Sequence, residues 1–453
     1  MKKHIIFIIL VIAVVACAFT LSSCKGGTFG LKFEVNGDHA SVVRYVGESL
    51  NVEIDAEYEG VPVTEIADNA FLNEFIRTIK LPDTITRIGT DAFKNCTELT
   101  DIDIGDGVTE IASGAFSGCT AIQTVALPET LTAIGESAFY ECTALSTIKL
   151  PDSLLTIGPR AFNKCMMLSS ISLPESVTVI PEGLFWGCTV LKDIEIKGPV
   201  TAIGEHAFTD CVMISKFDIP DTVTAIGASA FMNCTLLKEI EVPDGITVIN
   251  ETTFYKCERM SKCVLPDSVT EIKTEAFIYC RDLSDITLPS GLTVLGESAF
   301  MNCASLPEIT IPETLTTIEK TTFSGCSSLA TVTLHDGITH LGISVFADCT
   351  SLQSIVIPRG LTEIPLSSFS NCTALKSVTI PDIIQIIPLS AFNKCGNFTV
   401  VSWTGSYAEY WARNYGKKFE SLGDAEIVFV PPVEEKDDDG QGDGVWGPGG
   451  WGD

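Results

Sequence analysis

The sequence has few basic residues and very few histidines, and it lacks the short motifs that mark common catalytic sites. Lysine and arginine total 29 against 58 aspartates and glutamates, which gives a formal net charge of −29. Because nucleic-acid binding depends on cations that neutralise phosphates, no nucleic acid partner is expected. The chain has 5 histidines and contains no phosphate-binding loop, HExxH zinc motif or nucleophile elbow. We therefore expect no enzymatic activity.

Long apolar runs are also missing, apart from one at the N-terminus. Two lysines precede an apolar stretch at 5–20 that is short for a membrane span, and Leu, Ser, Ser and Cys follow at 21–24. This ending resembles the bacterial lipobox, in which the cysteine is lipidated; the alternative is an ordinary signal peptide with a chance cysteine. We expect a lipoprotein signal peptide at 1–23, lipidation of Cys24 and a tether at 24–30. The protein would then be exported, surface-exposed and attached to a membrane only by its lipid.

Cysteine, by contrast, is plentiful, with 17 residues in the chain. Fourteen of them lie 23 residues apart without exception, and each has a phenylalanine three residues before it, as in Phe93 and Cys96. A fixed period of this length indicates a repeat architecture in which each unit contacts only its neighbours. The fourteen are Cys96, Cys119, Cys142, Cys165, Cys188, Cys211, Cys234, Cys257, Cys280, Cys303, Cys326, Cys349, Cys372 and Cys395.

One unit, starting at Ile79, reads Ile-x-Leu-Pro-Asp-x-Ile-Thr-x-Ile-Gly-x-x-Ala-Phe-x-x-Cys-x-x-Leu-x-x. Ile79 and Leu81 alternate at period two, so both point inward from a short strand that the proline ends. Ile85 and Ile88 suit a second short extended stretch, and residues 92–96 have helical spacing over about one turn. Because one unit cannot bury its apolar face alone, the units must stack. We expect a β-rich solenoid of fourteen rungs with a parallel sheet and short turns or single helical turns between strands.

The repeats occupy about 63–400, and the segments on either side are expected to cap them. Alternating apolar residues at 31–62 predict strands that cover the first rung. Residues 401–430 predict a C-terminal cap with a helix that begins at Ser406. The acidic segment 431–453, rich in glycine and tryptophan, has no means of forming a core and is expected to be disordered.

The unit resembles the BspA-like class of leucine-rich repeats, which form long arrays in bacterial and some protist surface proteins. The resemblance covers about 63–398 and rests on the motifs at 79–82, 85–89 and 92–99. It implies a leucine-rich-repeat solenoid in a surface protein that acts in adhesion, matrix binding or contact between cells, and it provides no catalytic residue to transfer. We expect a monomer that binds an extracellular protein or glycan, and the alternative is a rigid spacer rod without a ligand.

An apolar stripe follows the repeat phenylalanine in part of the array. The same position is polar in other repeats, as in Lys94 and Ser117, so it is expected to be at least partly exposed. A contact patch is one interpretation, and packing against neighbouring turns is the other. The stripe consists of Tyr140, Trp186, Met232, Tyr255, Ile278 and Met301.

An acidic ridge follows the repeat proline. Stacked carboxylates repel one another, and calcium would relieve that repulsion, although Pro-Asp is also ordinary turn chemistry. No other cofactor or metal is expected. The candidate calcium ligands are Asp83, Asp106, Asp152, Asp221, Asp244 and Asp267.

The cysteine ladder allows a metal array or disulfides, but no CxxC pair is present. Side chains on stacked parallel rungs point alongside one another, which strains a disulfide. A position three residues after a buried phenylalanine suits a small apolar side chain, and free cysteine behaves as one. We therefore interpret the ladder as structural.

Overall fold

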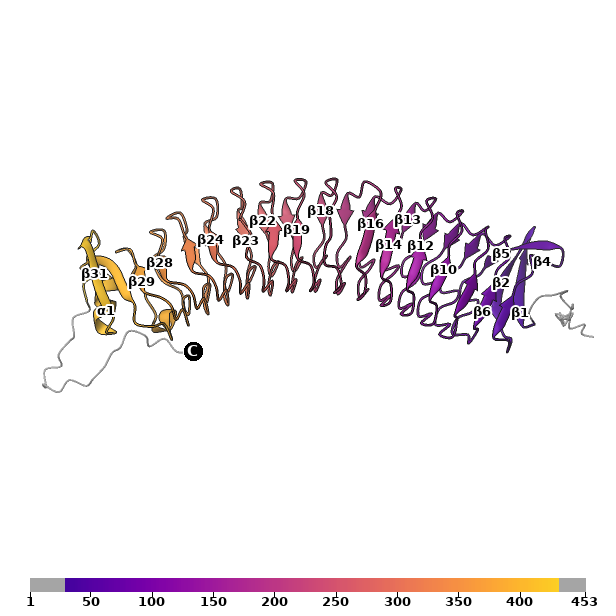
Figure 1. Ribbon diagram of the computed structural model, residues 1–453, viewed down its shortest axis with the longest axis horizontal. Helices are drawn as coiled ribbons and strands as arrows, with labels where there is room; N and C mark the ends of the chain where they lie inside the picture. The colour runs from indigo at the N-terminus through magenta and orange to yellow at the C-terminus, as the bar shows by residue number, and fades with distance from the viewer. Residues whose placement is uncertain (1–28, 432–453) are drawn as a thin grey trace, which may run out of the picture.

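The protein is a long, curved solenoid, shown from the side with its long axis horizontal in Figure 1. This computed structural model describes residues 29–431, so the predicted signal peptide at 1–23, Cys24 and all but the first residue of the predicted tail at 431–453 lie outside the described residues. Fourteen turns carry the cysteine repeat. One further turn comes from each of the strands β3 (Asn51–Glu53), β30 (Thr399–Thr404) and β31 (Lys418–Asp424), which makes about 17 turns. The fold prediction is confirmed.

The first strand of each repeat pairs in parallel with the equivalent strand of the next repeat, 23 residues later, as Thr124 pairs with Thr147. These strands are short because the proline after them cannot donate to a neighbouring strand. They are β3 (Asn51–Glu53), β6 (Thr78–Lys80), β8 (Asp101–Asp103), β10 (Thr124–Ala126), β12 (Thr147–Lys149), β14 (Ser170–Leu173), β16 (Asp193–Ile196), β19 (Glu239–Glu241), β21 (Lys262–Val264), β24 (Glu308–Thr310), β26 (Thr331–Thr333), β28 (Ser354–Val356) and β29 (Ser377–Thr379).

A second column of strands comes from the Ile-Thr-x-Ile part of the repeat. Its register is also parallel and 23 residues apart, as in Ile111 opposite Ile134. These strands are β5 (Val61–Ile66), β7 (Arg87–Ile88), β9 (Glu110–Ile111), β11 (Ala133–Ile134), β13 (Thr156–Ile157), β15 (Val179–Ile180), β17 (Ala202–Ile203), β18 (Ala225–Ile226), β20 (Val248–Ile249), β22 (Glu271–Ile272), β23 (Val294–Leu295), β25 (Thr317–Ile318) and β27 (His340–Leu341).

The first-strand sheet is not continuous, whereas the sequence predicts one sheet along the whole body. It divides into short groups, and residues 216–219, between β16 and β19, pair with neither neighbour in the described structure. In this repeat Phe217 replaces the usual isoleucine, and its ring packs 4.9 Å from that of Phe208 and 5.1 Å from that of Phe231. The bulkier side chain takes the space between rungs that close strand pairing requires.

Continuous backbone pairing runs instead through the turns that carry phenylalanine and cysteine. The Phe93 N–H donates to the Ala115 carbonyl at 2.7 Å, and the Asn95 N–H donates to the Ser117 carbonyl at 2.7 Å. The same two bonds recur at every step from Phe71 to the carbonyl of Asn393. Of the predicted connections, short turns are therefore the usual form; among the described residues, helical structure occurs only at η1 (Leu389–Phe392) and α1 (Tyr407–Asn414).

Each of these turns except the last, around Phe392, places two residues in the left-handed region, on either side of the phenylalanine. In the first full repeat they are Asp91 at φ 53° and Asn95 at φ 59°. Later repeats place Gly118 and Gly187 at the second position, with φ near 76°. Asparagine, aspartate and glycine adopt this conformation most readily, which explains their frequency there.

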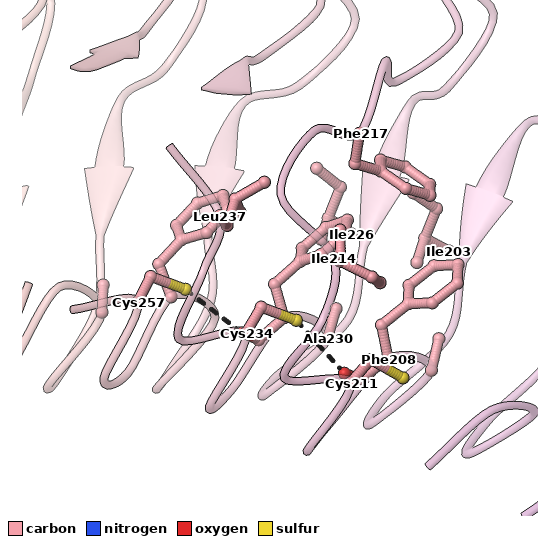
Figure 2. Packing of buried hydrophobic residues seen from close by; sticks show 14 of the residues in the cluster. Ile203, Phe208, Cys211, Ile214, Phe217, Ile226, Ala230, Cys234, Leu237 and Cys257 are labelled. Atoms are coloured by element: carbon pink, nitrogen blue, oxygen red, sulfur yellow. Dashed lines mark hydrogen bonds between the residues drawn. The ribbon is translucent and has the colours of Figure 1, made fainter. Parts of the chain in front are cut away.

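The core is a stack of aromatic rings with a row of thiols beside it, shown for three repeats in Figure 2. From Phe71 to Phe392, consecutive repeat rings are parallel-stacked with centroids 4.9 to 6.0 Å apart. Each ladder thiol donates to the carbonyl of the phenylalanine one repeat earlier, as Cys234 does to Phe208 at 3.3 Å. Each ring buries a large apolar area, and each thiol gives a phenylalanine carbonyl a hydrogen bond that an apolar side chain could not supply.

Both ends of the ring stack are covered. At the N-terminal end, β1 (Leu31–Asn36) and β2 (His39–Tyr45) form a hairpin, β4 (Glu57–Tyr58) pairs with β5, and Tyr45 stacks on the first repeat ring. At the C-terminal end, β30 (Thr399–Thr404) and β31 (Lys418–Asp424) extend the sheet. Helix α1 lies beside them, begins after Ser406, whose hydroxyl accepts from the Glu409 N–H at 3.2 Å, and packs Trp411 against Phe392.

A buried carboxylate fastens the last described segment to the array. Asp382 is 2% exposed; its Oδ1 accepts from Arg359 at 3.2 Å, and its Oδ2 accepts from the Glu426 N–H at 3.0 Å. Asp382→Ala should therefore release residues 425–431, at a local cost of about 1–3 kcal/mol. Limited proteolysis and hydrogen exchange measure this release.

The matched control for that change is Asp244→Ala, because Asp244 occupies the same repeat position but is exposed. Asp244→Ala should leave both the limited proteolysis and the hydrogen exchange of residues 425–431 unchanged. Equal protection of 425–431 in the Asp382→Ala variant and the unmodified protein would show that the carboxylate does not hold this segment.

Candidate binding surfaces

The ladder thiols are structural in the described region. Fifteen cysteines are free there, and all but Cys395 are fully buried. Burial raises the pKa of Cys142 to about 12, so its thiol stays protonated and unreactive at neutral pH. Residues 29–431 also contain no group of three or more histidine, cysteine, aspartate or glutamate side chains that could hold a metal.

All six ridge aspartates are exposed, one per repeat. Some serve the turn itself: Asp83 Oδ1 accepts from the Asp106 N–H at 3.0 Å. Others meet a cation, as Asp152 does at 3.9 Å from Lys197. These contacts agree with ordinary turn chemistry, and calcium binding stays a prediction.

Five of the six stripe side chains are partly exposed, as the sequence pattern indicates, and one is buried. Ile278 is 6% exposed and belongs to the packed interior, and the other five side chains are partly buried. Tyr255 packs edge-on against Tyr279 with centroids 6.1 Å apart, and Lys256 lies 5.2 Å from the Tyr255 ring centre. In this part of the array, the observed contacts are packing against neighbouring turns.

Two stripe residues, Tyr140 and Trp186, border a trough of about 770 Å³ on the turn surface. A volume of this size is typical of a small-ligand site. Small side chains line part of the trough, and larger aromatic and charged ones line the rest. The lining residues are Thr90, Asp91, Lys94, Ser113, Gly114, Ser117, Glu136, Ser137, Tyr140, Arg160, Asn163, Lys164 and Trp186.

Trp186 is held rigidly from the side of the following repeat. Its ring stacks on His206 with centroids 4.8 Å apart and an interplanar angle of 16°. Its indole N–H donates to Asp210 Oδ2 at 3.1 Å. Both partners come from the next repeat, so the ring is held from that side, and Trp186 is one of the residues that line the trough.

Tyr140 belongs to a charged network. Lys164 Nζ donates to the Tyr140 hydroxyl at 3.1 Å and to Glu141 Oε1 at 2.7 Å. The hydrogen bond from Lys164 lowers the pKa of Glu141, and the same bond raises the pKa of Lys164. The tyrosine is therefore positioned by its neighbours rather than left free on the surface.

Asn163 is the residue of the trough that the sequence pattern does not single out. Its side chain is 3% exposed, and Oδ1 is one of three buried side-chain polar atoms without a hydrogen-bond partner in the described structure. A buried polar atom without a partner costs about 1–3 kcal/mol, so it requires a reason. The repeat pattern contains only an indirect signal, since Asn163 occupies the same repeat position as Tyr140 and Trp186.

A second hollow, of about 1050 Å³, lies on the first-strand face beside the unpaired rung at 216–219. There Ile194 and Ile196 are only partly buried, although the equivalent pair in every other repeat has at least one buried member. Its exposed charges include the pair of Lys216 and Asp218 at 2.8 Å. Interrupted strand pairing explains this hollow, and none of its lining atoms is a buried polar atom without a partner.

The family model for the BspA type leucine rich repeat region matches residues 64–189, 155–284 and 270–399, which together make up more than half of the chain. The chain belongs to the BspA-type leucine-rich repeat family. The fold of this family is a non-enzymatic scaffold, and leucine-rich repeat proteins generally bind protein partners.

Solved structures of bacterial leucine-rich repeat proteins are among those similar to this chain. One from Bacteroides ovatus is 29% identical, with a TM-score of 0.66, and the match covers 87% of this chain and 98% of that one. A leucine rich cell surface protein from Faecalibacterium prausnitzii is 28% identical over 85% of this chain and 96% of that one, with a TM-score of 0.47. A comparison with curated proteins finds no match. No helix within residues 29–431 is long and apolar enough to cross a membrane.

Proposed function

We propose that this BspA-type leucine-rich repeat protein is a cell-surface binding protein that recognises an extracellular protein or glycan through its solenoid surface. In this proposal the chain is exported and anchored by a lipid on Cys24. The observation that carries the proposal is the trough bordered by Tyr140 and Trp186. A rigid aromatic wall and small floor residues give the trough a shape prepared for a ligand.

Binding tests this proposal. The protein is offered to extracellular matrix proteins and glycans, and a saturable interaction is expected. Trp186→Ala should weaken it about tenfold or more, because the change removes one wall of the trough. Tyr255→Ala is the matched control, since Tyr255 occupies the same repeat position outside the trough, and it should leave binding unchanged.

Two outcomes would contradict the proposal. Absence of any saturable ligand, combined with a phenotype in cells that depends only on the number of repeats, would identify a spacer rod. An interaction that Trp186→Ala leaves intact would place the binding surface outside the trough. The sheet-face hollow would then be the next surface to test, through substitution of Ile194 and Ile196.

A further inference from the structure

We propose that an apolar column beside the first-strand face binds a protein segment in which basic and apolar residues alternate. The column runs through four consecutive repeats and is here called the methionine edge. The inference goes beyond the proposed function, because it adds a second binding surface, none of whose residues lines the trough. The methionine edge consists of Met166, Met167, Val190, Val212, Met213 and Leu236.

The methionine edge occupies the two repeat positions that directly follow the ladder cysteine. In the other ten repeats, neither position carries an aliphatic or aromatic side chain larger than that of alanine. Three of the 7 methionines in the chain are concentrated here. Methionine is flexible and polarizable, so it adapts to the shape of a partner.

The large side chains of the edge are exposed rather than packed. Met167 is 55% exposed, Met213 41% and Leu236 39%. Ile214 and Leu237, which directly follow the last two, are core residues and are drawn in Figure 2. The core is therefore filled by the following residue in each repeat, and a contiguous exposed apolar surface of this kind is typical of an interaction site.

Regular stacking makes the edge continuous. The Lys192 N–H donates to the Ser169 carbonyl at 3.1 Å, and two repeats later the Lys238 N–H donates to the Ser215 carbonyl at 3.3 Å. Each bond aligns a turn with the equivalent turn 23 residues earlier. Counterparts on neighbouring rungs are thus about 4.8 Å apart, and four rungs make a column about 15 Å long.

The strand face next to the edge is irregular in the same repeats. Lys192 and Lys216, two or three positions after edge residues, line the sheet-face hollow of about 1050 Å³. The partly buried Ile194 and Ile196 also line it, and the rung at 216–219 pairs with neither neighbour. The edge and the hollow therefore belong to one continuous surface.

The charges of this strand face favour a cationic partner. An adjoining hollow of about 730 Å³ contains two lysines, and both are already paired, Lys216 with Asp218 at 2.8 Å and Lys262 with Asp285 at 3.1 Å. Its four other carboxylates are exposed and form no salt bridge within residues 29–431, so basic side chains of a partner would complement them. They are Asp221, Glu239, Glu241 and Asp244.

The same charges disfavour two other occupants. A second copy of the chain has a net charge of −29, and the segment at 432–453 is acidic, so either would bring further carboxylates to this face. Successive side chains of an extended segment point to opposite sides. One row of a segment with alternating apolar and basic residues can therefore contact the edge while the other meets the carboxylates.

The test titrates the full-length protein with a synthetic peptide of about ten residues in which leucine and lysine alternate, long enough to span the edge. Calorimetry should show saturable binding. Two control peptides, with serine in place of leucine or glutamate in place of lysine, should bind at least about tenfold more weakly. Absence of binding by the leucine–lysine peptide, or equal binding of either control peptide, would overturn the proposal.

The variant with Met167→Ser, Met213→Ser and Leu236→Ser tests the edge itself. Serine occupies the same position in later repeats, as at Ser305, and the three side chains are exposed, so thermal stability should be unchanged. Peptide binding should weaken about tenfold or more. Unchanged affinity in this variant would refute the assignment of the edge.

The matched control for the apolar changes is Ile343→Ser with Leu366→Ser, because these side chains are 51% and 53% exposed but lie outside the edge. It should leave the affinity unchanged, and an equal loss would show that the peptide binds any exposed aliphatic surface. Glu239→Gln with Glu241→Gln should weaken binding and reduce its dependence on salt. Glu308→Gln, at the strand position of Glu239 in a later repeat, should do neither.

Trp186→Ala distinguishes failure of this inference from failure of the proposed function. It should leave peptide binding unchanged, because Trp186 lines the trough and is not part of the edge. Loss of peptide binding in Trp186→Ala would place the peptide in the trough, which overturns the edge and leaves the proposed function intact. If the peptide, the matrix proteins and the glycans all fail to bind, both proposals fail.

Discussion

Raising the pH from 8 to 10 is expected to unfold the repeat array. Thirteen of the described thiols have a pKa raised chiefly by burial, to about 12 for Cys96, Cys142 and Cys326, against an ordinary value of 9.0. The unfolded chain therefore loses thiol protons from about pH 9, whereas the folded chain retains them. Stability is fully present below pH 9 and falls as the pH rises through 9 toward 12.

The expected magnitude is large because the thiols are many. Each contributes a loss of about 1.4 kcal/mol per pH unit in that window, and the sum exceeds the roughly 5–15 kcal/mol that stabilises an ordinary domain. Circular dichroism against pH would follow the unfolding. Thiol alkylation should remain slow at pH 8 and become rapid at the same pH as the loss of structure.

The control is a variant with Cys142→Ala, Cys165→Ala and Cys188→Ala. These changes lower stability at every pH by leaving small cavities, but they should also reduce the pH dependence by about 1.4 kcal/mol per unit for each thiol removed. If the free energy of unfolding of this variant falls as steeply between pH 9 and 10 as that of the unmodified protein, titration of lysine or tyrosine causes the alkaline sensitivity instead.

Phe231→Ala is expected to destabilise the array by about 3–5 kcal/mol. The ring is fully buried and stacks 5.4 Å from Phe208 and 5.7 Å from Phe254, with Phe217 also packed against it. Because each repeat is stabilised mainly by its neighbours, the damage should divide the array into two parts that unfold separately. Denaturant titration with hydrogen exchange resolves the two transitions.

Lys238→Ala provides the reference for that measurement, since Lys238 is exposed in the same repeat. It should change stability by no more than about 0.5 kcal/mol. A cost below about 1 kcal/mol for Phe231→Ala would mean that the ring stack contributes little and that the turn hydrogen bonds hold the array together.

Sequence reasoning selected only some of the residues that line the trough. It selected Tyr140 and Trp186 by their repeat position, and both border the trough. The same position also selected Ile278, which is buried, because one position can face the interior or the surface according to its neighbours. Asn163 was indistinguishable from other polar residues in the column, since its missing partner is a property of the packed structure.

The amino-acid pattern alone is enough to predict the solenoid, its repeat length and the inward face of each strand. A 23-residue period places the same residue on the same part of every turn, so Phe93 and Cys96 must align with their copies when the units stack. The left-handed turns, the thiol-to-carbonyl bonds, the unpaired rung at Phe217 and the trough become visible only in the folded structure. Each of these features depends on contacts between repeats. The space and the hydrogen-bond partners available to a side chain there come from residues at least one repeat away.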